Sequence, residues 1–151
     1  MRTLSWIGAF AAAGALMAAT AQAQPPGTQE TAKTQERMAR EAAMLTGHAN
    51  STNRECGAAI TVTFDWAGAK EEDLSTYSAN GWCDAALEGI RRVCSDAPGK
   101  DAVKEKIKRV TCGFGPERSI SLKEDGSVDY KISFKSVNDA DFVYESLENA
   151  L

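Results

Sequence analysis

The chain has 151 residues, with 17 Lys and Arg against 21 Asp and Glu and a formal net charge of −4. This length is typical of one domain with a single hydrophobic core, and the acidic balance argues against nucleic-acid binding, which usually needs a basic face. The single histidine, His48, argues against histidine-dependent hydrolysis, because any catalytic triad would have to recruit that one residue.

Residues 1–23 have the pattern of a signal peptide. Arg2 precedes an uncharged, alanine-rich run over residues 4–19. Ala21 and Ala23 then frame a small-residue cleavage site before Gln24. The apolar run is about sixteen residues long, which is short for a membrane span of roughly 20 residues. We therefore predict a cleaved signal rather than a retained N-terminal anchor, and a periplasmic or secreted product without a membrane span.

The rest of the chain divides into two predicted parts. Residues 24–54 are expected to hold an N-terminal helix and a polar linker, because good helix formers run from Thr28 to Thr46 and Gly47 then provides a helix stop. His48 would lie in the mobile linker. Residues 55–151 are expected to form the folded domain.

This domain opens with an apolar alternation and then a helical repeat. The alternating apolar residues are Cys56, Ala58, Ile60, Val62, Phe64 and Trp66. They predict a strand with one buried face and one solvated face. Further along, apolar residues recur at helical spacing at Cys83, Leu87, Ile90 and Cys94. This second pattern predicts a helix with one inward stripe.

Five more elements are predicted after that helix. They are a short helix at 100–108, strands at 110–114, 119–123 and 128–135, and a final helix after Asn138. The pair Asp125–Gly126 is a strong hairpin signal between the last two strands, and we expect the three strands to form a meander. The predicted fold class is α+β, in the order α-β-α-α-β-β-β-α. It has two layers, with helices on one face of a mainly antiparallel four-stranded sheet.

Export places the four cysteines in an oxidising compartment, where disulfides form. If Cys83 and Cys94 share a helix, their Cα atoms lie about 16 Å apart, beyond the roughly 7 Å that a disulfide tolerates. A helix antiparallel to the first strand favours bonds Cys56–Cys94 and Cys83–Cys112, while the reverse layout keeps the other pairing open. The cysteine spacings do not match a structural zinc site or a redox C-x-x-C, so we expect no metal and no cofactor.

No catalytic constellation stands out, and we therefore predict an exported, non-enzymatic binding or accessory module. Its partner would be a protein or an envelope polymer, and neither the sequence pattern nor the charge selects between them. The candidate binding face consists of polar residues on the solvated sides of the strands: Thr61, Thr63, Ser119, Ser121, Lys123, Lys131, Ser133 and Lys135. A plain solvent-exposed sheet would show the same pattern.

Two other features carry alternative interpretations. A candidate basic patch is formed by Arg91, Arg92, Lys100, Lys104, Lys106, Lys108 and Arg109. Such residues are usually solvated helix faces, but they could bind anionic polymer or lipid headgroups. The alternative function is a small carboxylate-dependent hydrolase of cell-wall glycans, with Asp65 and the loop acids at 71–73 near Trp66 and Trp82.

Overall fold

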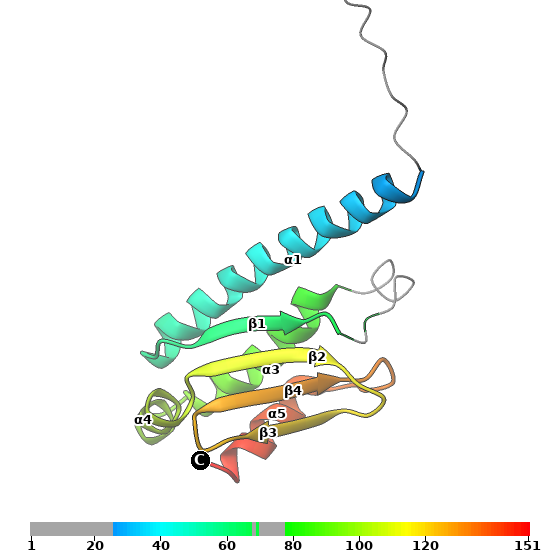
Figure 1. Cartoon of the computed structure of the whole chain (residues 1–151). Coiled ribbons are helices and arrows are strands. Elements are labelled where there is room, and N and C mark those ends of the chain that lie inside the picture. Colours follow the sequence, from blue (N-terminus) through cyan, green and yellow to red (C-terminus); the bar gives the residue numbers. More distant parts are fainter. Residues whose placement is uncertain (1–25, 68, 70–77) are drawn as a thin grey trace, which may run out of the picture.

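The computed structural model describes residues 26–67, 69 and 78–151 (Figure 1). The predicted signal peptide at 1–23 and the loop acids at 71–73 lie outside this part of the chain. The helices are α1 (Pro26–Cys56), α3 (Ala79–Val93), α4 (Ala97–Lys106) and α5 (Asp139–Glu148). The strands are β1 (Thr61–Asp65), β2 (Arg109–Phe114), β3 (Ser119–Leu122) and β4 (Ser127–Ile132).

The four strands form one mixed sheet in the order β1-β2-β4-β3. β1 pairs with β2 and β2 pairs with β4 in parallel, and only β3 runs antiparallel, against β4. The prediction of a mainly antiparallel meander was therefore wrong, although the class of helices with a four-stranded sheet is correct. The difference arises because β4 lies between β2 and β3 instead of at the end of the sheet.

Burial explains why β4 takes this central place. Its inward residues Val128, Tyr130 and Ile132 are all fully buried, whereas Ile120 and Leu122 of β3 are only partly buried. Since β4 carries three inward apolar side chains and β3 only two, a central β4 places more apolar surface under neighbouring elements than a central β3 would. The hairpin between these strands is present, and the positive φ of 80° at Gly126 is a backbone conformation that suits glycine.

Helix α1 is longer than the sequence pattern predicted. It continues through Gly47 and the expected linker to Cys56, which ends the helix instead of starting a strand, so β1 begins only at Thr61. The physical reason is a buried helical stripe at Leu45, Ala49, Thr52 and Cys56. Burying this stripe outweighs the cost of about 1 kcal/mol for a glycine inside a helix.

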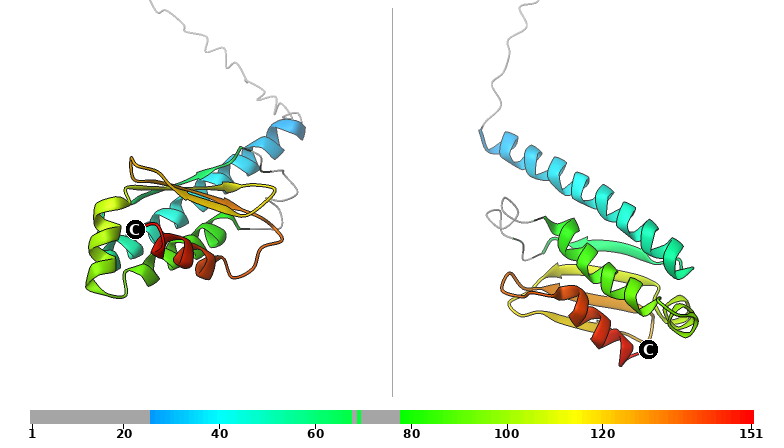
Figure 2. Two further views of the ribbon diagram at one scale, coloured as in Figure 1. Left: turned by 90° about the horizontal axis from the view of Figure 1, so that it is seen from below. Right: turned by 180° about the vertical axis from the view of Figure 1, so that it is seen from behind.

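The helices cover one face of the sheet, as seen from below in Figure 2. Helix α3 lies between α1 and α5 and packs against both. Its inward stripe of Cys83, Leu87 and Ile90 is completely buried. The other face of the sheet, which is towards the viewer in Figure 1, is covered by none of the described helices.

One disulfide joins two of the helices, and a second joins a helix to the sheet. Cys56–Cys94 joins the C-terminal ends of α1 and α3, and Cys83–Cys112 joins the start of α3 to β2. This is the pairing that an antiparallel covering helix favours. All four cysteines are buried, so the bonds lie inside the core.

Candidate functional site

The open face of the sheet is built from three rows of side chains that run across the strands. The first row is Asp65, Gly113, Lys131 and Ser119; the second is Thr63, Thr111, Asp129 and Ser121; the third is Thr61, Arg109, Ser127 and Lys123. Neighbouring strands are about 4.8 Å apart, and side chains on one face of a strand repeat about every 6.7 Å. The face is therefore a regular array of mostly small polar groups.

The first row contains an ion pair that crosses a strand. Lys131 Nζ on β4 lies 3.2 Å from Asp65 Oδ2 on β1, above Gly113 of the intervening β2. A Cβ atom at Gly113 would lie 2.9 Å from Lys131 Nζ, so the absence of a side chain leaves room for this bridge. The pKa of Asp65 is lowered, first by the backbone N–H of Ala67 and then by Lys131.

The other two cations of the face are also paired with carboxylates. Lys123 lies against Asp129 in the neighbouring row, and this contact raises the pKa of Lys123. Arg109 Nη2 lies 3.6 Å from Asp125 Oδ2 in the hairpin turn, and Asp125 also accepts hydrogen bonds from Ser127. The charges of the open face are thus balanced within it.

Most of the predicted binding face is assembled as expected, but its last two residues are not part of it. β4 ends at Ile132, and the chain turns there, with Ser136 N donating to Ser133 O at 2.9 Å. Ser133 is consequently buried, and its hydroxyl donates to Pro116 O at 3.4 Å. Lys135 is exposed in the turn beyond the sheet.

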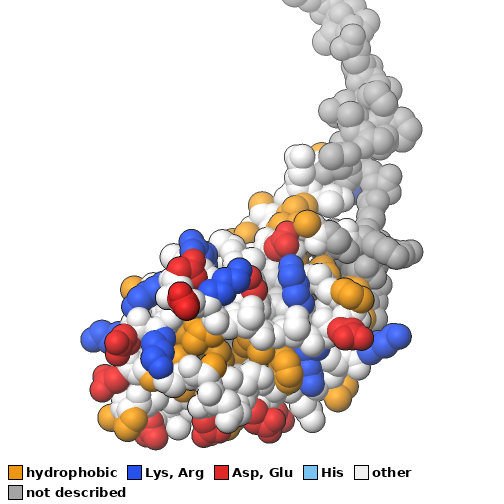
Figure 3. All heavy atoms as spheres, turned by 60° about the horizontal axis from the view of Figure 1, so that its bottom comes forward, with side chains coloured by type: hydrophobic (Ala, Val, Ile, Leu, Met, Phe, Trp, Pro, Cys, Tyr) orange, Lys and Arg blue, Asp and Glu red, His pale blue; other side chains and the backbone are white. Residues whose placement is uncertain are grey.

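The predicted basic patch is not one surface. Arg91 and Arg92 lie on α3, the three lysines at 100, 104 and 106 lie on α4, Lys108 follows α4, and Arg109 points from the open face. The Lys108 ammonium donates to the backbone carbonyl of residue 104 at 2.7 Å, which caps α4. On the face of the molecule drawn in Figure 3, basic and acidic side chains are interspersed, so that face presents no extended field of one sign.

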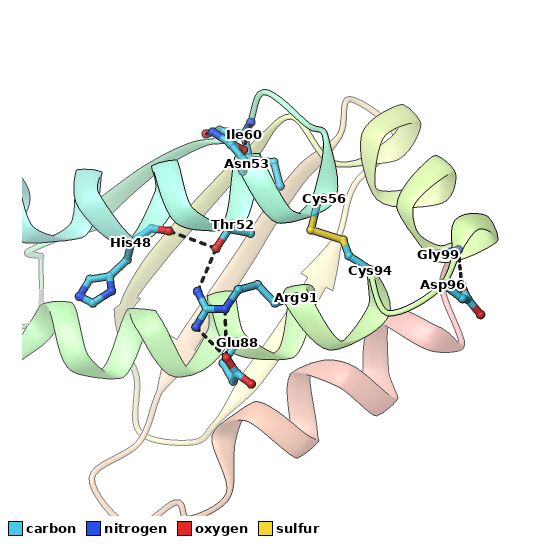
Figure 4. The surroundings of a disulfide bond; sticks show 10 residues. All are labelled: His48, Thr52, Asn53, Cys56, Ile60, Glu88, Arg91, Cys94, Asp96 and Gly99. Atoms are coloured by element: carbon cyan, nitrogen blue, oxygen red, sulfur yellow. Dashed lines mark hydrogen bonds and ion pairs between the residues drawn. A yellow bond between two sulfur atoms is a disulfide. The ribbon is translucent and has the colours of Figure 1, made fainter.

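A polar network connects α1 to α3, and Arg91 lies at its centre (Figure 4). Its guanidinium donates to Thr52 Oγ1 at 3.0 Å and Glu88 Oε2 at 2.7 Å, and lies 3.3 Å from Asp84 Oδ1. His48 Nδ1 lies 3.1 Å from the same Asp84 oxygen. His48 was expected in a mobile linker, and the helix instead holds it in this network because α1 does not stop at Gly47.

Of the residues considered for glycan hydrolysis, only Asp65, Trp66 and Trp82 lie in the described part of the chain, and the loop acids at 71–73 lie outside it. Asp65 has a lowered pKa, which suits a base or nucleophile and not the general acid that glycoside cleavage also needs. The two tryptophans pack on phenylalanines: Trp66 lies 4.6 Å from Phe64 and Trp82 lies 5.4 Å from Phe134, between ring centroids. Both therefore contribute to an aromatic cluster at the edge of the core.

Two residues that position the site were missed by the sequence analysis. Glu41 of α1 accepts hydrogen bonds from Asn80 N at 2.8 Å and from Ser78 Oγ at 3.2 Å, which caps the start of α3 from another helix. Asn53 of α1 bonds to the backbone of Ile60 just before β1. The contact of Asn53 depends on a helix that continues past Gly47, so the predicted stop concealed it. Glu41 lies within the predicted helix, but its contacts are with residues 37 and 39 positions away, which no local pattern indicates.

Among the described residues, no group of three His, Cys, Asp or Glu side chains could hold a metal ion. No helix in the same part of the chain combines the length and apolar character needed to cross a membrane. No family model matches the chain, and no curated protein and no solved structure matches it either.

Proposed function

We propose that this protein is an exported, non-enzymatic binding or accessory module, and that the open sheet face holds its partner. The observation that carries the proposal is the uncovered face of a mostly parallel sheet. Parallel strands are almost always covered on both faces, yet the described helices cover only one face of β1, β2 and β4. A partner on the open face would complete the usual three layers.

The chemistry of the face indicates what this partner offers. Hydroxyl groups of Thr61, Thr63, Ser119 and Ser121 are exposed, and hydroxyls both donate and accept hydrogen bonds. Because the lysines and the arginine of the face are already paired with carboxylates, the face selects for polar groups more than for net charge. A neutral polar surface of a protein or of an envelope polymer meets this requirement.

The scaffold also favours binding without rearrangement. The strands under the face are joined to α3 by Cys83–Cys112, and α3 is joined to α1 by Cys56–Cys94. A surface that is already ordered loses little conformational entropy when a partner binds.

The test is capture from the envelope of the producing cell by the oxidised chain of residues 24–151. The double variant Thr63→Lys with Ser121→Lys adds two positive charges to the middle row, and we expect it to lose about tenfold in the amount captured. The matched control, Ser95→Lys with Asn149→Lys, adds the same charges away from the face and should capture as much as the parent protein.

Two results would contradict this proposal. Equal capture by both double variants would mean that the open face is not the binding surface. The second result is an activity: the parent protein releases new reducing sugar ends from purified cell-wall glycan, and the Asp65→Asn variant does not. This result would support a glycan hydrolase instead of a binding module.

A further inference from the structure

A second feature lies at the edge of the sheet, where β1 has β2 on one side and no described strand on the other. Thr61 donates its backbone N–H to Lys108 O at 3.1 Å, which is towards β2. Because the backbone groups of successive residues in a strand point to alternate sides, the N–H and C=O groups of Val62 and Phe64 point to the free edge. β1 therefore offers two donor–acceptor pairs away from the sheet.

The backbone groups of Ile60, just before β1 on the same edge, show what kind of group this edge binds. Asn53 Nδ2 donates to Ile60 O at 2.9 Å, and Ile60 N donates to Asn53 Oδ1 at 2.8 Å (Figure 4). A side-chain amide presents a donor and an acceptor much as a peptide group does. Asn53 thus occupies the position of one peptide unit in a neighbouring strand. Among the described residues, no side chain makes the same pair of hydrogen bonds to the backbone of Val62.

A groove continues from this point between α1 and β1. Its volume is about 370 Å³, and its walls include Thr46, Ala49 and Asn50 of α1 and Val62 of β1. None of the residues that line it carries a charge. The small side chains on the helix wall leave the edge of β1 accessible from this side.

We infer that the groove between α1 and β1 is a docking site for an extended, uncharged polypeptide segment of a partner protein, which adds to the sheet as a strand beside β1. Strand addition of this kind takes its affinity from main-chain hydrogen bonds and its specificity from alternate side chains. The inference goes beyond the proposed function, because it uses the edge of the sheet and not its open face.

The groove favours a peptide over a glycan and over a charged segment. The outward groups of Val62 and Phe64 alternate donor and acceptor with a repeat of about 6.7 Å, which another extended backbone matches along its length. A charged side chain entering the groove would lose hydration without finding an opposite charge on its walls. An uncharged segment with small or β-branched side chains meets both conditions.

The experiment uses the oxidised chain of residues 24–151 and an array of uncharged octapeptides built from Ser, Thr, Ala, Val and Ile. The strongest peptide is then added in excess while amide hydrogen exchange is followed by NMR. We expect exchange at Val62 and Phe64 to slow by about tenfold or more, and exchange at Thr61, which is already bonded to β2, to change little.

Variants and modified peptides test the geometry. Asn50→Arg places a charge on the groove wall and should weaken peptide binding about tenfold, whereas Gln35→Arg, on the exposed N-terminal half of α1, should not. Two peptide analogues are also compared, one N-methylated at its odd-numbered residues and one at its even-numbered residues. Only one of these two sets of amides can face β1, so one analogue should lose binding and the other should keep it.

The inference is overturned if no peptide of the array binds. It is also overturned if a peptide binds without protecting Val62 and Phe64, or if cell-wall glycan fragments protect these amides in its place. The open-face variant Thr63→Lys with Ser121→Lys should bind the peptide normally, so failure of this inference and failure of the proposed function can be told apart.

Discussion

Arg91 shows how single residues connect the helices. Its side chain is only 15% exposed, and it holds Asp84, Glu88 and Thr52 at once, so one guanidinium joins α3 to α1. The planar fork of five donors makes arginine suited to several acceptors, and a lysine could not replace it with the same geometry.

The partner Glu88 predicts a measurable pH dependence. Its pKa is lowered, first by the hydrogen bond from Arg91, so it favours the folded state above its ordinary value of 4.5 and loses this contribution as the pH falls through its folded pKa. Because the carboxylate is 43% exposed, solvent screens the pair, and we expect Glu88→Gln to lower the free energy of unfolding at pH 7 by only about 0.5 kcal/mol.

Urea unfolding at pH 7 and at about pH 2.5 measures this contribution. The difference between the parent protein and Glu88→Gln should shrink at the lower pH, because protonation of Glu88 removes the charge that pairs with Arg91. Glu55→Gln, on the exposed end of α1, removes the same charge outside the arginine pair and serves as the control. A difference that persists unchanged at low pH would show that the ion pair is not its cause.

At the scale of elements, burial decides outcomes that local pattern leaves open. A buried stripe carries α1 through Gly47, and the same principle places β4 in the centre of the sheet. Between α3 and α5, by contrast, close packing requires a glycine. A Cβ atom at Gly89 would lie 2.7 Å from the carbonyl oxygen of Ala140. Glycine is the residue that permits this approach.

Replacing these two glycines by alanine should therefore have opposite effects. Gly47→Ala meets no atom within 4 Å and should stabilise the fold by up to about 1 kcal/mol, because alanine is the better helix former. Gly89→Ala should destabilise it by about 1–3 kcal/mol, since the backbone of α5 must move. Thermal unfolding measures both effects. If both variants shifted the midpoint in the same direction, the close contact between α3 and α5 at Gly89 would be contradicted.

The sequence predicted the order of the elements, and for β1, β3 and β4 it also predicted which side chains face the core, because apolar alternation identifies the buried face directly. It did not predict strand pairing, since side chains alternate identically in parallel and antiparallel strands, and the open face suggested an antiparallel sheet. The rows of the candidate site, such as Lys131 reaching Asp65 across Gly113, depend on that pairing. The sequence did not predict the α1–β1 groove, because Gly47 indicates a helix stop and the wall of the groove lies on the part of α1 around and after it. The helical spacing of Leu45 and Cys56 is the signal that the helix continues.

At the scale of the whole molecule, the two disulfides link α1 to α3 and α3 to β2, the elements that support both candidate surfaces. Their sequence separations are 38 and 29 residues. In the chain-entropy account, loops of this size stabilise the folded state by about 3–4 kcal/mol each. Since a folded domain is commonly stable by only about 5–15 kcal/mol, the two bonds account for a large share of this stability. The proposed export would take the chain to an oxidising compartment, where such bonds persist.

Mass spectrometry of the natively purified protein, alkylated before any reduction, tests the two bonds and the proposed export most directly. The expected result is a chain that begins at Gln24, carries no alkylated cysteine, and gives linked peptides for Cys56 with Cys94 and for Cys83 with Cys112. A chain that still begins at Met1 and takes up alkyl groups on all four cysteines would contradict the account of an exported, disulfide-bonded binding module.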